Sequence, residues 1–163
     1  KLELLIKKAG VTIHDRKVVS PALQKAALTG SPAAAMELPD GTIVTGKTSD
    51  LLGASSALLL NALKFGGISD DIHLISPVII EPIQHLKVDH LGNRNPRLHT
   101  DEVLIALSIC AATNPTAELA MEQLNKLRGC EVHSSVILSQ VDEKVFRRLG
   151  VNITCEPKYE NKQ

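Results

Sequence analysis

The chain is poor in aromatic residues and has no excess of charge of either sign. Its 163 residues include no Trp, one Tyr and two Phe, and 18 Lys and Arg residues balance 18 Asp and Glu residues. Proteins that bind single strands of nucleic acid usually stack bases on aromatic side chains, and proteins that bind duplexes need excess positive charge. The composition therefore argues against a nucleic-acid partner and predicts an aliphatic core.

Cysteine pairs and long apolar runs are also missing. Cys110, Cys130 and Cys155 are odd in number and far apart, with no CxxC pair, so neither a zinc site nor a disulfide framework is predicted. Reduced thiols are typical of a cytoplasmic protein. No apolar run approaches the roughly 20 residues that span a membrane, and no secretory signal is present. We predict no membrane partner, no bound cofactor and no metal.

The length fits one compact α/β domain over residues 1–163, with 44% hydrophobic residues to form its core. The chain begins with Lys1 rather than Met, and residues 1–9 already have the pattern of a helix. We therefore expect an excised piece of a longer protein. The charged tail at 158–163 is expected to fray.

The segment Gly41–Thr48 matches the phosphate-binding P-loop pattern G-x-x-x-x-G-K-[ST]. Its four intervening residues, 42–45, are all β-branched, which favours a pleated strand over a phosphate cradle. A strong turn signal at 39–41 follows an apolar run. We interpret the region as a β-hairpin with strands at 33–38 and 42–46, and the P-loop pattern as a coincidence.

Capping residues, prolines and glycines divide the rest of the chain into short elements. Helices are predicted at 1–9, from Ser20-Pro21 to Gly30, at 50–65, 101–112, 115–128 and 142–149, with a helical turn that begins at Ser76-Pro77 and is interrupted at Pro82. Strands are predicted at 11–13, 72–75, 131–138 and 151–155, and a polar loop at 89–98.

This order of elements predicts a three-layer α/β/α sandwich with a mixed sheet. It resembles the cytidine-deaminase-like fold, in which a hairpin leads into a helix and a parallel strand follows. Zinc deaminases carry His-x-Glu or Cys-x-Glu where that helix opens and Pro-Cys-x-x-Cys at the next helix. This chain has Thr48-Ser49-Asp50-Leu51 and Ser76-Pro77-Val78-Ile79-Ile80 there. We expect the fold without zinc ligands and without deaminase chemistry.

A family resemblance extends over nearly the whole chain. It is carried by the segments Ala33–Ser49, Leu51–Ala57, Asn95–Val103 and Leu127–His133. They resemble a bacterial family described as domain of unknown function 1846, and the match is to the C-terminal part of the family protein. The resemblance implies that the missing N-terminal part of the same protein is a partner. The family has no established activity, although an ATP-dependent peptidase label is attached to some members. No H-E-x-x-H zinc-peptidase motif is present.

The first candidate site joins the polar loop to a predicted helix. Its residues are Arg94, Arg97, His99, Thr100, Asp101 and Glu102. Free N–H groups at a helix N-terminus favour an anion, two arginines could bind phosphate or carboxylate, and the histidine could transfer a proton. Alternatively, Thr100 is an ordinary helix cap, the two carboxylates interact with the helix dipole, and the arginines are solvated.

The second candidate site is the segment Lys47, Thr48 and Ser49, which leaves the hairpin and enters a predicted helix. Its N–H groups could also bind an anion. Alternatively, Ser49 is a simple N-cap and Lys47 is exposed. We favour a small-molecule-binding domain for an anionic metabolite or nucleotide in a cytoplasmic bacterial protein. A hydrolase or ATP-dependent peptidase component is the second alternative, and a structural or oligomerisation domain, for example in a homo-oligomer, is the third.

Overall fold

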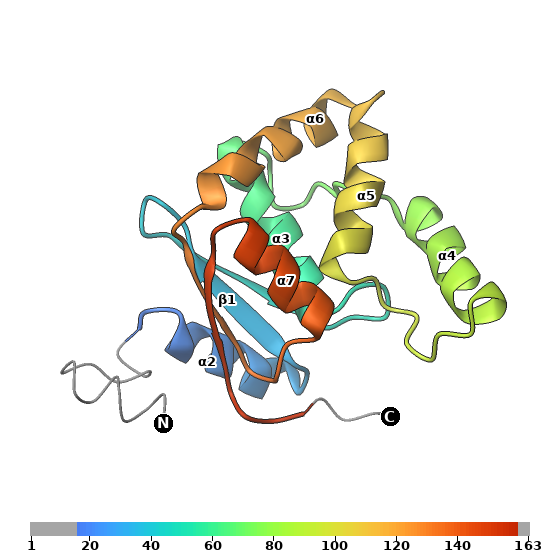
Figure 1. Cartoon of the computed structure of the whole chain (residues 1–163). Coiled ribbons are helices and arrows are strands. Elements are labelled where there is room, and N and C mark those ends of the chain that lie inside the picture. Colours follow the sequence, from blue (N-terminus) through green and yellow to red (C-terminus); the bar gives the residue numbers. More distant parts are fainter. Residues whose placement is uncertain (1–15, 160–163) are drawn as a thin grey trace.

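The computed structural model describes residues 16–159 and contains one mixed sheet with helices around it (Figure 1). The strand order is β2-β1-β3-β4. β1 is antiparallel to both neighbours, and β3 and β4 are parallel. The strands are β1 (Ala33–Glu37), β2 (Ile43–Lys47), β3 (Glu131–Ser134) and β4 (Asn152–Cys155). The mixed α/β class predicted from the sequence is confirmed.

The helices of the described residues are short, and several end in a tighter or wider turn. The α-helices are α2 (Val19–Thr29), α3 (Ala54–Leu63), α4 (Pro77–His85), α5 (Thr100–Ala111), α6 (Pro115–Glu122) and α7 (Gln140–Arg148). Two 3₁₀ turns, η2 (Lys64–Gly66) and η4 (Gln123–Leu127), follow α3 and α6. A π-helical turn, η3 (Leu86–His90), continues α4.

Side chains of the central strand β1 alternate between two apolar clusters. Ala34 and Met36 belong to the main core, whereas Ala35 packs in a smaller cluster with Val18 and Ala22 of the α2 region. Because successive side chains of a strand point to opposite faces, α2 covers one face of the sheet and the main core covers the other. Helices therefore lie on both faces of the sheet.

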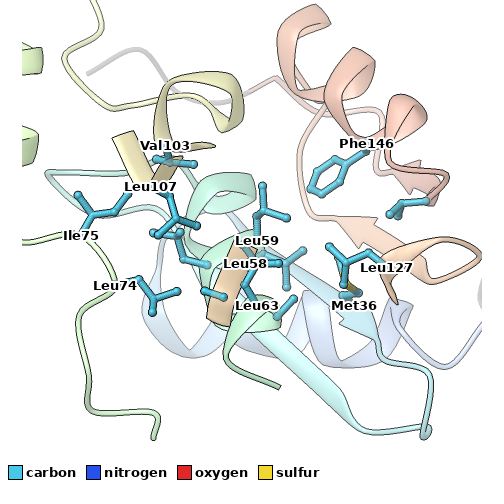
Figure 2. Close-up of a cluster of buried hydrophobic side chains, with 14 of the residues drawn as sticks. Met36, Leu58, Leu59, Leu63, Leu74, Ile75, Val103, Leu107, Leu127 and Phe146 are labelled. Carbon is cyan, nitrogen blue, oxygen red and sulfur yellow. The ribbon is translucent and has the colours of Figure 1, made fainter. Parts of the chain in front are cut away.

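The main core is almost entirely aliphatic, as predicted. Figure 2 shows leucines of α3 beside Met36 of β1 and Val103 and Leu107 of α5. Phe146 of α7 is buried there, whereas Phe65 and Tyr159 are exposed. With no Trp in the chain, dispersion contacts among branched aliphatic side chains hold these layers together.

The hairpin prediction is confirmed, and the geometry explains both glycines of the P-loop pattern. β1 and β2 pair antiparallel with Ala33 opposite Lys47 and Glu37 opposite Ile43. Gly41 has φ of +89° in the connecting turn, a conformation that side chains disfavour. A Cβ on Gly46 would lie 2.2 Å from the backbone nitrogen of Leu58 in α3. The two glycines of the pattern are therefore explained by a turn and a helix–strand contact.

The helix after the hairpin starts later than predicted. α3 begins at Ala54 rather than near residue 50, and Ser49 does not cap it. The Ser49 hydroxyl instead accepts hydrogen bonds from the N–H groups of Leu51 and Leu52, which forms a local turn. Leu52 then makes a parallel bridge to Leu98, so these residues are extended rather than helical.

Three further elements differ from the predictions. Residues 72–75 do not form a strand, because Leu74 and Ile75 enter the core from a bend without a strand partner. Pro82 does not interrupt its helix. It removes one N–H near the exposed first turn, where water can bind the carbonyl that loses its partner. β3 ends at Ser134 rather than residue 138. The predicted helix 1–9 and strand 11–13 lie outside the described residues.

Gly46→Ala is expected to lower the free energy of unfolding by about 1–3 kcal/mol, because the added methyl group meets backbone atoms that cannot move aside. Gly53→Ala is the matched control, since Gly53 has φ of −69° and the nearest atom to its added Cβ is 3.9 Å away. That control should lose less than about 1 kcal/mol. Urea unfolding measures both values, and equal losses would contradict the close contact.

Candidate functional site

The two segments predicted as candidate sites lie side by side. Leu98 is fully buried, and its N–H donates to the carbonyl of Leu51 at 3.0 Å. The carbonyl of Leu98 accepts from the N–H of Gly53 at 3.3 Å and from the hydroxyl of Ser56 at 2.7 Å. The loop that precedes α5 is therefore fastened to the segment that leads into α3.

Arg97 links the two candidate segments through its side chain. Its Nε donates to the carbonyl oxygen of Ser49, and its backbone N–H donates to Oδ1 of Asn95 at 3.0 Å. Arg97 is half-buried, whereas Arg94 and Lys47 are exposed and Thr48 is buried. Three cationic side chains thus come from the loop before α5 and from the end of β2, and one of them, Arg97, is held by a hydrogen bond to the segment that follows β2.

The N-terminus of α5 differs from the prediction. His99 is the N-cap and Thr100 is the first helical residue, so Thr100 does not cap the helix. Both the N–H and the hydroxyl of Thr100 donate to Oδ1 of Asp142 in α7, at 3.0 and 2.7 Å. The N–H of Glu102 donates to Oδ1 of Asp101 at 2.8 Å. Carboxylates of the chain itself therefore bind two of the N–H groups that were predicted to meet a ligand.

A buried lysine lies behind this helix terminus. The side chain of Lys87 is 5% exposed, and its Nζ donates to Oε1 of Glu102 at 2.8 Å and to the carbonyl of Arg97 at 2.7 Å. The same Oε1 accepts from the N–H of His99 at 2.8 Å, as in a capping box. Burying an ammonium group is unfavourable unless it is paired, and this geometry supplies two partners.

His99 and Asp142 form the second charged contact, with 3.7 Å between Nδ1 and Oδ2. The carboxylate of Asp142 raises the pKa of His99, although burial opposes it. Burial raises the pKa of Asp142, but hydrogen bonding from His99 and Thr100 outweighs it, so that pKa is lowered overall. The arrangement favours a protonated imidazole beside an ionised carboxylate. The protonated imidazole of His99 can donate a proton to a bound group.

Lys87 and Asp142 were not recognised as site residues from the sequence. For Lys87 a signal existed. Ile80 and Ile83 precede it by seven and four positions, so the lysine lies on the stripe that a helix buries. A charge on such a stripe indicates a buried partner. Asp142 has no comparable signal, because 42 residues separate it from Thr100.

A second polar cluster joins β3 to β4. His133 is fully buried, with Nδ1 at 2.7 Å from the hydroxyl of Thr154 and Nε2 at 2.8 Å from Oε2 of Glu156. Arg16 donates to the same hydroxyl and, at 2.8 Å, to Glu131. A hydroxyl, an imidazole and a carboxylate in this order resemble a hydrolase triad. Within residues 16–159, no three His, Cys, Asp or Glu side chains are placed to hold a metal ion.

The fold and the site define a mixed α/β domain with a charged cluster where two loops meet. The chain belongs to the family described as domain of unknown function DUF1846, C-terminal, whose model matches residues 14–163. The family resemblance inferred from the sequence is therefore confirmed.

Bacterial relatives match over almost the full chain. The chain is 58% identical over 160 residues to the UPF0371 protein of Corynebacterium urealyticum, covering 98% of this chain and 32% of the relative. It is 56% identical to the UPF0371 protein of Corynebacterium glutamicum, covering 99% of this chain and 33% of that protein. It is 53% identical to the UPF0371 protein of a Streptococcus pneumoniae strain, covering 98% of this chain and 33% of that protein. The chain thus spans about one third of the relatives it matches.

The described residues include no helix whose length and hydropathy would suit it to cross a membrane.

The His99–Asp142 contact is expected to make stability depend on pH. Because the pKa of His99 is raised, its protonation adds to the free energy of unfolding. This stabilisation is complete below the ordinary pKa of 6.5 and is lost as pH rises through the folded-state pKa. Because the pKa of Asp142 is lowered, its ionised form also adds to the free energy of unfolding. This stabilisation is present above the ordinary pKa of 3.8 and is lost as pH falls through the folded-state pKa. The contact therefore stabilises most between these two values.

Denaturant unfolding of wild type and His99→Gln at about pH 5.5 and pH 8.5 tests this dependence. The difference in free energy of unfolding between the two proteins should be larger at the lower pH. A difference that is equal at both values, or larger at the higher pH, would contradict the pairing.

Lys87→Met is expected to lower the free energy of unfolding by about 1–3 kcal/mol, because it leaves the carboxylate of Glu102 without its buried cation. In Lys87→Met/Glu102→Gln the charge and its partner are removed together, while an amide oxygen can still accept from His99. The double variant should lose less than the sum of the two single losses. Additive losses in urea unfolding would show that the pair is not coupled.

Proposed function

We propose that this chain is the anion-binding module of a cytoplasmic bacterial protein, and that it binds an anionic metabolite or a nucleotide where the loop at 47–52 meets the loop at 94–99. The observation that carries the proposal is the fixed position of Arg97. Its Nε donates to the carbonyl of Ser49, and its two Nη groups make no hydrogen bond to residues 16–159. A guanidinium that is held by Nε presents its Nη groups as a preorganised donor pair for phosphate or carboxylate.

The neighbouring side chains suit the same ligand. Arg94 and Lys47 are exposed on the two loops and add positive charge. His99 is partly exposed, and its raised pKa favours the protonated form that donates to an anion. The helix N–H of Thr100 is already bonded to Asp142, so cationic side chains, rather than the helix terminus, supply the binding energy. The free cysteines Cys110, Cys130 and Cys155 suit a reducing compartment.

We further infer a cytidine-deaminase-like arrangement for this sheet. In support of it, the β1–β2 hairpin leads toward α3, and the later strands β3 and β4 are parallel. In such an arrangement, the exit of the hairpin at Lys47, Thr48 and Ser49 borders the ligand cleft. The remaining two thirds of the family protein would form the other wall of that cleft. The residues at the zinc positions, Thr48-Ser49-Asp50, do not include a zinc ligand set.

A hydrolase is the second candidate, and the chain of contacts from Thr154 through His133 to Glu156 is the observation that favours it. In a hydrolase the hydroxyl would attack and the imidazole would accept its proton. The complete burial of His133 argues for a structural role, because a substrate must reach the groups that react. Hydrolysis of a peptide or ester that is abolished by Thr154→Val would favour the hydrolase.

Arg97→Ala is expected to weaken anion binding at least tenfold, because a charge-assisted hydrogen bond contributes about 1.5–3 kcal/mol. The probes are inorganic phosphate, nucleoside triphosphates and phosphorylated sugars, measured by thermal shift and titration calorimetry. Arg97→Lys keeps the charge but loses the fork of donors, so it should restore binding only in part.

Arg148→Ala is the matched control, since Arg148 is an exposed arginine on α7, and it should bind as wild type does. Lys47→Ala tests the P-loop interpretation. A P-loop requires that Lys47→Ala abolishes nucleotide binding while Arg97→Ala leaves it intact, and that pattern would contradict the proposal.

A further inference from the structure

The helix α4 and its continuation η3 form an arm that contacts the main core only along one narrow stripe, through Ile80 and Ile83. Of residues 77–90, only Ile80 and Lys87 are buried. In Figure 1 this arm lies at the edge of the molecule, beyond α5 and away from the sheet. Most helices of globular proteins bury an apolar stripe against a neighbour, and this arm leaves much of its apolar surface uncovered.

Large apolar side chains project from the arm and from the adjacent helix. We use the name arm surface for Val78, Leu86, Leu91, Ile105 and Ile109, which are 78%, 49%, 64%, 60% and 69% exposed. Ile105 and Ile109 are four residues apart on α5 and therefore lie on one face of it. Glu102, the partner of Lys87, lies on the same face of α5 as these two isoleucines, so that face is on the side of the arm. Single exposed apolar residues are common, whereas several large ones on a short arm and on the helix face beside it suit an interaction surface.

Polar contacts hold the arm in position. Lys87 donates to Glu102 and to the carbonyl of Arg97, and the side-chain amide of Gln84 donates to the carbonyl of Asp50 at 2.9 Å. These bonds fix the arm to the two loops of the candidate site. The arm surface is therefore presented in a defined orientation without being buried.

We propose that the arm surface docks against the part of the family protein that lies outside this chain. The length of the relatives supports this occupant, since this chain corresponds to only 32% and 33% of the Corynebacterium proteins. A partner within the same polypeptide has a high effective concentration, so a modest apolar surface is sufficient to keep it docked. The inference does not depend on the identity of the ligand, but it brings the rest of the protein beside the two loops.

Hydrogen–deuterium exchange tests the proposal on two proteins, this chain alone and the full-length Corynebacterium urealyticum relative. In the full-length protein, amides that align with residues 77–91 should exchange at least about tenfold more slowly than in the chain alone. The control is α2, which carries Leu28, an 85% exposed leucine outside the arm surface. The exchange rates of the α2 amides should differ by less than about twofold between the two proteins. Equal rates for the arm in the two proteins, or equal slowing of the arm and α2, would overturn the proposal.

Substitutions separate the proposed occupant from a second copy of the chain. In the relative, Asp at the position that aligns with Leu86 should restore fast exchange in the arm, whereas Asp at the position that aligns with Leu28 should not. Sedimentation of the isolated chain at micromolar concentration is the second measurement. A stable dimer that Leu86→Asp dissociates and Leu28→Asp does not would identify a second copy as the occupant and overturn the proposal.

Discussion

The burial of Leu98 is the constraint on which the candidate site depends. Its side chain is fully buried, and both of its backbone polar groups are bonded to the segment between Leu51 and Ser56. A buried backbone group without a partner would be unfavourable, so this pairing fixes the position of the whole loop before α5. Once Leu98 is fixed, Arg97 lies at Ser49 on one side and His99 lies at Asp142 on the other. One apolar residue thus positions two charged neighbours.

The charged cluster behind the loop is built from alternating signs. Lys87 comes from η3, Glu102 from α5, His99 from the N-cap of α5 and Asp142 from α7, and each cation faces a carboxylate. Because the two cations and two carboxylates compensate one another, the cluster has no net charge when the imidazole is protonated. In the proposed function, an incoming anion would interact mainly with Arg94, Arg97 and Lys47 and would reach the cluster only at the partly exposed His99. Asp142 also occupies the helix terminus that would otherwise attract the anion.

Features with local causes could be predicted from the sequence, and features with distant causes could not. The caps at Ser76 and Asn114 and the left-handed Gly30 follow from neighbouring residues, and the helices that they delimit are found. Ser49 gave the signal of a cap, but the partner that keeps Leu52 extended is Leu98, 46 positions along the chain. The two candidate segments were found because polar loops are recognisable, whereas their contact is a property of tertiary packing. The contact of Asp142 with Thr100 likewise depends on how α7 packs against α5, and no local pattern in the sequence indicates it.

The two glycines of the hairpin have a consequence for how such chains are classified. Gly41 permits a left-handed turn, and Gly46 permits the approach of a helix backbone, so two independent steric requirements produce the spacing of a nucleotide-binding motif. Any relative that keeps this hairpin and this helix contact is expected to keep the two glycines at this spacing, whether or not it binds a nucleotide. In such relatives the persistence of the two glycines measures the inheritance of a backbone shape, and it carries no independent information about a ligand.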